Sequence, residues 1–194
     1  ISVKHKFNGD WAVSGVVRPD SNFGGMKESW TMGDSYLKIN YPTIYQSEGS
    51  LSIKGDVRYI APTRESSKKA KLNGVISPYV QAGGKAGRFD LSYILIPKFY
   101  LNTVEAPGQK QYGHGHWLSA SYKLSEKVNV DMAVYPAWTY LRDEPVAFND
   151  LPAYPGFTVS FNEDFSISPY VEVPLLKAEA KNSSVGGTLN YKFF

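Results

Sequence analysis

The 194-residue chain contains no cysteine, so neither a disulfide framework nor a thiol nucleophile is available to it. It has a mean hydropathy of −0.31 and no run that approaches the ~18 apolar residues of a membrane helix. Its net charge is only +3, and its lysines and arginines are spread along the chain without forming a basic patch. These absences argue against a disulfide-rich scaffold, a helical membrane protein and a nucleic-acid-binding protein.

Aromatic residues are abundant instead: 14 tyrosines, 10 phenylalanines and 4 tryptophans make up 14% of the chain. High aromatic content with low mean hydropathy fits a β-protein in which every second residue is apolar. On composition alone, a membrane β-barrel and a soluble β-sandwich fit equally well.

Two-residue alternation of apolar and polar residues recurs along the chain, whereas helix-period patterns are scarce. The alternation predicts strands over 37–45, 51–59, 89–101, 118–124, 128–138, 165–175 and 189–193. Prolines recur inside the predicted strands, at Pro42, Pro78, Pro97, Pro136, Pro169 and Pro174. Because proline has no N–H to donate to a strand ladder, each one predicts a bulge or a strand end.

The connections between these strands alternate in length. Short polar turns are predicted at 8–10, 46–49, 83–87, 125–127 and 162–164, and longer segments at 19–34, 62–70, 102–113, 142–153 and 177–184. Membrane barrels have tight turns at their periplasmic end and long loops at the other, whereas a soluble sandwich has no reason to alternate. The sequence therefore favours a closed antiparallel transmembrane β-barrel, as one domain over residues 1–194.

The number of strands has two readings. Five short turns flank ten strands, and the C-terminal strand makes eleven, whereas bacterial single-chain barrels normally have an even number. If Ile1 to Phe7, which is shorter than the ~9–11 residues needed to span a membrane, is not a membrane strand, the count is ten. If a strand precedes Ile1, the count is twelve.

The C-terminal segment carries a first resemblance. Leu189, Tyr191 and Phe193 share one face of the predicted strand, and Asn190 and Lys192 share the other. In a bacterial chain this ending resembles the last strand of an outer-membrane β-barrel, which the barrel-assembly machinery recognises during insertion. The resemblance implies a location in the bacterial outer membrane, with the lipid bilayer and lipopolysaccharide around the protein.

A second resemblance concerns the order of segments, which is similar to that of the small twelve-stranded oligosaccharide porins of the oligogalacturonate and sialic-acid-oligomer type. The stretches that carry it are 116–122, 164–172 and 185–193. The resemblance implies passive, diffusive uptake through a lumen rich in basic residues. The N-terminal strand of that family has no counterpart in this sequence.

If the apolar face meets lipid, the alternate residues point into the lumen. The basic candidates are Arg18, Lys38, Lys54, Arg58, Lys71, Lys98, Lys123 and Lys192, and the acidic ones are Asp56, Asp90, Asp131 and Glu172. The aromatic candidates are Tyr36, Tyr79, Tyr100, Trp117, Tyr135 and Tyr170. Eight basic minus four acidic residues leave +4, which predicts a narrow channel, or porin, for small anionic or sugar-like solutes.

The alternative is a non-conducting barrel with a structural, adhesion or complex-assembly role, in which Lys54, Asp56, Arg58 and their neighbours pair across the lumen and plug it. No enzyme activity, cofactor or metal is predicted. His114 and His116 form a pair in an expected loop with no third ligand in evidence.

Overall fold

The computed structural model describes residues 2–7, 11–17, 19–22, 29–47, 51–177 and 183–191. These residues form an all-β, antiparallel protein with one main sheet and one small hairpin. The first strands of the main sheet are β1 (Ser2–Lys6), β2 (Ala12–Val16), β5 (Tyr36–Gln46), β6 (Ser52–Ile60), β7 (Leu72–Ala86), β8 (Phe89–Asn102) and β9 (Lys110–Lys123). The others are β10 (Val128–Val134), β11 (Ala137–Leu141), β12 (Ala147–Asp150), β13 (Pro152–Ser160), β14 (Phe165–Pro174) and β15 (Ser184–Tyr191).

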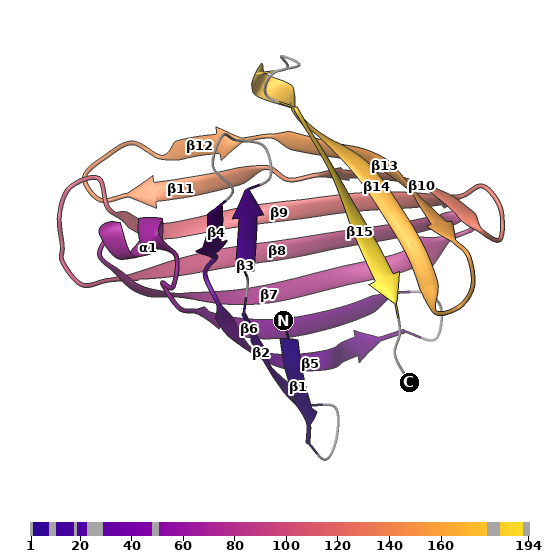
Figure 1. The fold of residues 1–194 in the computed structure, drawn as a ribbon, viewed down its shortest axis with the longest axis horizontal. Coiled ribbons are helices and arrows are strands. Elements are labelled where there is room, and N and C mark those ends of the chain that lie inside the picture. The colour runs from indigo at the N-terminus through magenta and orange to yellow at the C-terminus, as the bar shows by residue number, and fades with distance from the viewer. Residues whose placement is uncertain are drawn as a thin grey trace.

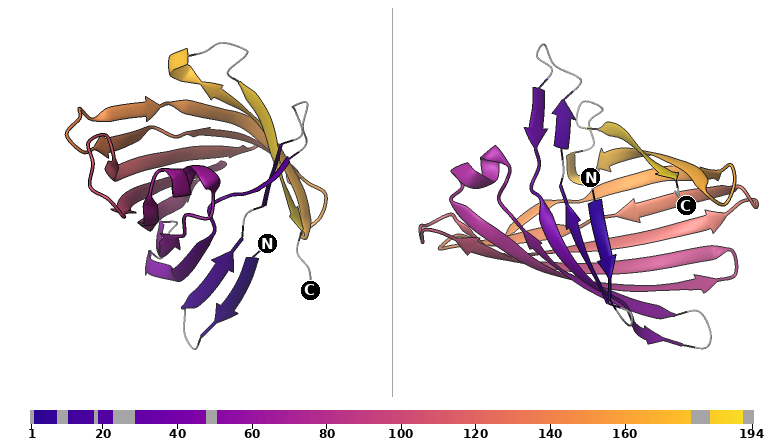
Figure 2. Two further views of the ribbon diagram at one scale, coloured as in Figure 1. Left: turned by 60° about the vertical axis from the view of Figure 1, so that its left-hand side comes forward. Right: turned by 60° about the horizontal axis from the view of Figure 1, so that its bottom comes forward.

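The main sheet follows the order of the chain, β1-β2-β5-β6-β7-β8-β9-β10-β13-β14-β15. Strand β11 pairs with β9 beyond the end of β10, and β12 pairs with β11 in turn, so these two short strands extend the wall. The sheet curls strongly and brings β1 and β15 round to the same side of the molecule, together with both termini (Figures 1 and 2). Within the described residues no pairing joins β1 to β15, so the sheet is curled but not closed.

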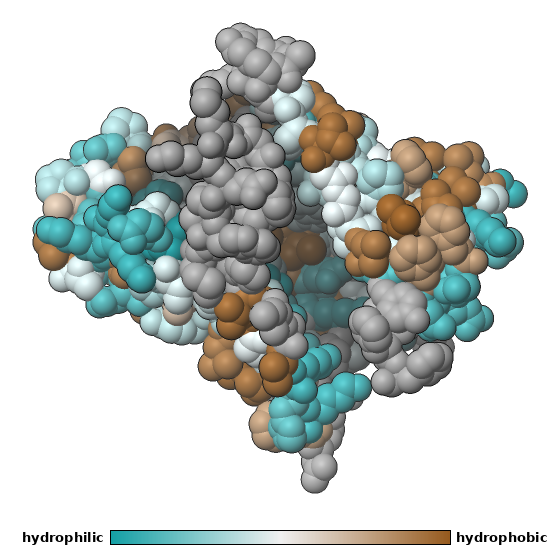
Figure 3. Space-filling model, viewed as in Figure 1, coloured by the Kyte–Doolittle hydropathy of each residue, from teal (hydrophilic) through white to brown (hydrophobic). Residues whose placement is uncertain are grey.

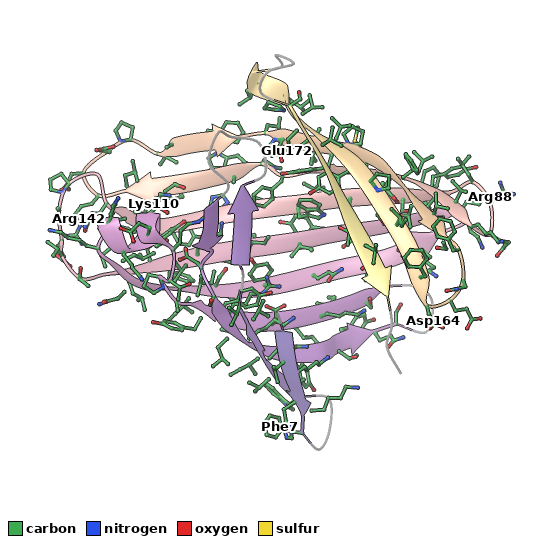
Figure 4. The ribbon with its side chains drawn as sticks, in the orientation of Figure 1. Phe7, Arg88, Lys110, Arg142, Asp164 and Glu172 are labelled. Carbon is green, nitrogen blue, oxygen red and sulfur yellow. The ribbon has the colours of Figure 1, made fainter. Side chains whose placement is uncertain are left out.

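The short turns and the long segments lie at opposite ends of the curled sheet. Figure 4 places Arg88 and Asp164 at the turn end, and Lys110 and Arg142 at the other. The turns predicted at 125–127 and 162–164 are confirmed, since they fall between β9 and β10 and between β13 and β14. The turn predicted at 83–87 is wrong: β7 continues to Ala86, and the chain reverses at Gly87, which has a φ of +62°.

The long segments contain structure that the sequence did not indicate. The segment 19–34 includes the hairpin of β3 (Pro19–Asn22) and β4 (Ser29–Met32), and the segment 62–70 includes the helix α1 (Glu65–Lys69). Strand β12 lies within 142–153, and a short 3₁₀ turn, η1 (Leu175–Lys177), follows β14. None of the helical segments in the described ranges has the length and apolar character needed to cross a membrane.

The prolines mark interruptions of the sheet, as the sequence predicts. The β5–β6 register shifts between Tyr41 and Tyr45, around Pro42, and Pro136 separates β10 from β11. Pairing of β7 with β8 stops after Ile76–Phe99 and resumes at Val80–Leu95, which brackets Pro78 and Pro97. There the fully buried Ser77 donates a hydrogen bond from Oγ to the carbonyl oxygen of Pro97, 2.6 Å away. A side-chain donor thus satisfies a carbonyl that the broken ladder leaves unpaired.

The outer face of the sheet is apolar and exposed, as the alternation predicts. Exposed large apolar residues on it include Leu37, Ile39, Val57, Val80, Leu118 and Met132. By contrast, the buried apolar residues are few and mostly small: Ala12, Val75, Ile96, Ala133 and Ala153 within the described ranges. A water-soluble monomer rarely exposes contiguous apolar patches larger than a few hundred square ångströms, so a surface of this kind is typical of contact with another protein or with lipid.

Candidate functional site on the inner face of the sheet

The inner face of the curled sheet is polar and hollowed. Figure 3 shows a recess with a largely hydrophilic floor between the two edges of the sheet. One cavity of about 660 Å³ lies against β8, β9, β10, β13 and β14, and another of about 720 Å³ lies near the long segments. The second is lined by Lys69, Lys71, Lys98 and Lys110 together with Tyr100.

The wall formed by β5 to β8 carries the basic candidates. Lys38 on β5 is opposite Arg58 on β6 in the strand register, Lys54 lies on β6, and Lys98 lies on β8. No ion pair of Lys38, Lys54 or Lys98 occurs within the described ranges. Lys71 directly precedes β7 and has a positive φ of 54°.

Arg58 is the most constrained side chain of this wall. Its Nε and Nη2 donate to the two carboxylate oxygens of Asp56 at 2.6 and 3.0 Å. Its guanidinium carbon lies 3.4 Å from the ring centroid of Tyr79 and 5.5 Å from that of Tyr36. Because Asp56 and Arg58 lie on the same strand, their ion pair runs along the wall. It does not bridge the lumen, as the plugged alternative would require.

The opposite wall carries the acids. Asp131 on β10 accepts hydrogen bonds from Ser121 Oγ at 2.6 Å and from Thr158 Oγ1 at 2.7 Å. Asp131, Glu172 and Asp90 line the 660 Å³ cavity, and among the described residues no lysine or arginine lines it. The sequence predicted the overall excess of positive charge, but not this segregation of basic residues on β5–β8 from acids on β8–β14. The sequence contained this information, because consecutive strands of a meander are neighbours in the sheet, and the order of the charged residues along the chain therefore gives their order around the wall.

Aromatic rings accompany the acids. The ring centroids of Trp117 and Tyr154 are 5.0 Å apart, and those of Tyr154 and Tyr170 are 5.8 Å apart. Tyr135 lies between β10 and β11, with its ring centroid 6.0 Å from that of Trp117. The sequence singled out Trp117, Tyr135 and Tyr170 but not Tyr154. Tyr154 comes directly after the segment 142–153, which the sequence assigned to a loop.

The remaining predicted residues lie away from the cavities or outside the described ranges. Lys123 is exposed at the end of β9, where its Nζ is 3.0 Å from the carboxylate of Glu126 in the following turn, so it belongs to the rim. Arg18, Lys192 and Phe193 lie outside the described residues, and Tyr191 is described only as the last residue of β15. Leu189 is exposed on β15.

On the outer face, aromatic residues gather near both ends of the sheet. Near the short turns the paired rings are Trp11–Tyr41, Phe89–Tyr122 and Phe161–Phe165, with centroids 4.9, 4.9 and 5.2 Å apart. Near the long segments they are Phe99–Tyr112, Tyr112–Tyr140 and Trp138–Phe148, at 5.3, 5.3 and 4.9 Å. We call these sets the turn-end belt and the loop-end belt. Among the exposed aliphatic residues of this face, Leu91 on β8 and Leu118 on β9 lie between the two belts.

The two histidines also lie on the outer face. The expectation that they lie in a loop is wrong, because both are on β9. His114 Nδ1 is 2.9 Å from His116 Nε2, and His116 Nδ1 is 2.7 Å from the hydroxyl of Tyr93. No group of three or more potential metal-binding side chains occurs in the described part of the chain.

Comparison with known proteins identifies no family to which the chain is similar. No model of a protein family matches the chain, and no curated protein matches it.

Proposed function

We propose that the protein is an outer-membrane β-barrel that forms a narrow passive channel for small anionic or sugar-like solutes. The observation that carries the proposal is the outer face, where an exposed aliphatic band lies between two aromatic belts. Aromatic girdles at the two interfaces and an apolar band between them are the signature of membrane barrels, whose interiors are polar. The polar inner face with its cavities matches the second half of that signature.

A membrane location requires the sheet to be closed, because unpaired backbone groups at an open edge are costly in lipid. Ten successive antiparallel pairings connect β1 to β15, so the two edge strands run in the same direction. One further strand, antiparallel to both, would close the sheet as a barrel of twelve strands. A barrel of that size is wide enough to leave a narrow channel, whereas interiors near eight strands are filled by side chains.

Basic residues on β5–β8 support a preference for anions, since charges in a confined lumen attract counter-ions. Lys38, Lys54 and Lys98 are among the cations of this wall that have no ion-pair partner in the described ranges. Charge on Arg58, by contrast, is largely balanced by Asp56.

The second candidate is a barrel that does not conduct and serves as an anchor, an adhesin or part of a complex. The packing of Arg58 between Asp56, Tyr79 and Tyr36 favours it, because a fixed network of this kind narrows the lumen.

Single-channel recording separates the two candidates. Purified protein, refolded in detergent and shown to be folded by its altered gel migration without boiling, is added to planar lipid bilayers. The channel proposal predicts discrete conductance steps with a reversal potential displaced toward anions in a salt gradient. Folded protein that inserts into vesicles but produces no steps would support the non-conducting candidate and contradict the channel.

A further inference from the structure

We infer that the inner face of β9, β10, β13 and β14 carries a stacking track for neutral sugar rings, formed by Trp117, Tyr154 and Tyr170. The inference rests on the proposed channel and names the class of solute for one of its walls. The four strands are neighbours in the sheet (Figure 1), and the three side chains line the same 660 Å³ cavity. Cavities of ~300–1,000 Å³ are typical of small-molecule sites.

The rings are arranged in a row across the wall. Centroid separations of 5.0 Å for Trp117–Tyr154 and 5.8 Å for Tyr154–Tyr170 are those of rings in contact. Between Trp117 and Tyr154 the intervening strand contributes Ala133, which is buried and small, so the two larger side chains meet above it. The row therefore crosses from β9 to β14 without an interruption by a bulky side chain.

Tyr170 is fixed by the strand beside it. It pairs in register with Gly186 of β15, and a Cβ added to Gly186 would lie 2.5 Å from Cζ of the Tyr170 ring and 2.6 Å from its hydroxyl oxygen. The ring thus lies directly over the backbone of β15, in space that only glycine leaves free. Tyr170 also lines the cavity and meets the Tyr154 ring edge-to-face, at an interplanar angle of 72°, so it adds aromatic surface on which a sugar ring can stack.

Hydrogen-bonding groups for sugar hydroxyls lie beside the rings. Asp131 accepts one bond on each carboxylate oxygen, from Ser121 and Thr158, and each oxygen keeps a further lone pair. Thr158 is 2.9 Å from Ser168 Oγ, so the hydroxyls form a chain that fixes the carboxylate. An aromatic surface with a few fixed polar groups is the usual composition of a site that orients a small ligand.

The charge of this cavity selects neutral sugars over sugar acids. Asp90, Asp131 and Glu172 line it, and none of the lining residues in the described ranges is basic. A carboxylate or phosphate on the solute would meet like charge here, whereas it would be attracted to the wall of β5–β8. The two walls therefore differ in the solute groups that they hold.

Binding is measured by the intrinsic fluorescence of the folded protein in detergent, since Trp117 is part of the track. The probes are cellobiose, as a neutral disaccharide, and a digalacturonate of the same length. We expect saturable binding of cellobiose that is tighter than that of digalacturonate. Replacing Tyr154→Leu or Tyr170→Leu should weaken cellobiose binding about three- to tenfold, the loss expected for one aromatic contact.

Two control pairs separate loss of the ring from loss of the fold. Tyr100→Leu removes a tyrosine from the other cavity and should leave cellobiose binding unchanged. Gly186→Ala keeps all three rings but displaces Tyr170, so binding should weaken as in Tyr170→Leu. At Gly187 an added Cβ would come no closer than 3.6 Å to its neighbours, so Gly187→Ala should bind like the wild type. Each variant is checked by its gel migration without boiling.

The track is overturned if wild-type protein shows no saturable change with cellobiose, or if digalacturonate binds more tightly. It is also overturned if the Tyr154→Leu and Tyr100→Leu variants bind cellobiose equally well. Conductance recorded on the same preparations keeps the two proposals apart. Channel steps without cellobiose binding would refute the track alone, and cellobiose binding without steps would refute the channel alone.

Discussion

Replacing Arg58→Gln should destabilise the protein more than any other single neutralisation of a lumen lysine or arginine. The change removes both hydrogen bonds to Asp56 and the contact with the Tyr79 ring, and leaves the Asp56 carboxylate without its partner. Breaking a fully buried ion pair costs ~3–5 kcal/mol. Because the Arg58 and Asp56 side chains are 22% and 16% exposed, we expect a loss of about 2 kcal/mol in the free energy of unfolding.

The double variant Asp56→Asn with Arg58→Gln should recover about half of that loss. It removes the unpaired carboxylate but does not restore the cation–π contact, which is worth ~0.5–2 kcal/mol. Lys54→Gln is the matched control, because Lys54 lies on the same strand face, is exposed and has no ion pair in the described ranges. Its effect should stay within about 0.5 kcal/mol.

A double-mutant cycle gives the coupling free energy of the two side chains. Its members are the wild type, Asp56→Asn, Arg58→Gln and the double variant, each unfolded with urea in detergent and followed by circular dichroism. A coupling near zero, with the single losses simply adding in the double variant, would refute the argument that Asp56 and Arg58 form one unit.

Three further predictions follow from the structure. Replacing Lys38, Lys54 and Arg58 together by Gln should shift the reversal potential toward cations in a salt gradient, because Asp131 and Glu172 on the opposite wall and Asp90 on β8 remain. An unchanged potential would show that these three basic residues do not set the selectivity. The chain has no cysteine, so single Cys variants can be labelled at one site each. Cys at Ser66 or at Lys110 should react with an impermeant maleimide on intact cells, whereas Cys at Glu126 should not. Labelling at Glu126 alone would show the opposite orientation. The hydrogen bond from Arg142 Nη1 to Glu105 Oε2, 2.7 Å long, lowers the pKa of Glu105. This link between two long segments therefore stabilises them at pH values above the ordinary pKa of a glutamate, and the stabilisation is lost as the pH falls through the lowered value. The protection of residues 103–109 against hydrogen exchange, taken relative to the intrinsic exchange rate at each pH, should then fall in acid for the wild type and change little with pH in Arg142→Gln.

Much of the fold follows from the two-residue alternation. The predicted strands 37–45 and 89–101 lie within β5 and β8, and 51–59 lies within β6 except for Leu51, because an exposed apolar face against a polar one leaves a clear period of two. Pro42, Pro78 and Pro97 coincide with breaks in pairing on one side of their strands, because a missing N–H interrupts the ladder there, whereas Pro97 and Pro169 lie in unbroken register with β9 and β15. The eleven strands of the meander also agree with the count of five turns and a terminal strand.

Other features depend on contacts that local sequence does not encode. Gly83 and Gly84 indicated a turn, but both pair with β8 in the interior of β7, so tertiary pairing overrides their local preference. Strand β12 was missed because residues 142–153, which contain it, are rich in proline and charge, and its pairing partner is β11. Tyr154, directly after that segment, was not singled out as an inward residue. Within the site, the alternation predicted which residues share the polar face of the sheet. It did not show that Arg58 is neutralised by Asp56 on its own strand.

The central claim, that the outer face of the sheet meets lipid and the inner face meets water, is tested most directly along β8. Spin labels are attached one at a time to Cys at positions 90–95 in protein reconstituted into lipid vesicles, and collision rates with oxygen and with a water-soluble nickel chelate are compared. We predict lipid access at 91, 93 and 95 and water access at 90, 92 and 94, because Leu91, Tyr93 and Leu95 share one face of the strand and Asp90, Ser92 and Ile94 share the other. Water access at all six positions, or no alternation, would contradict the account.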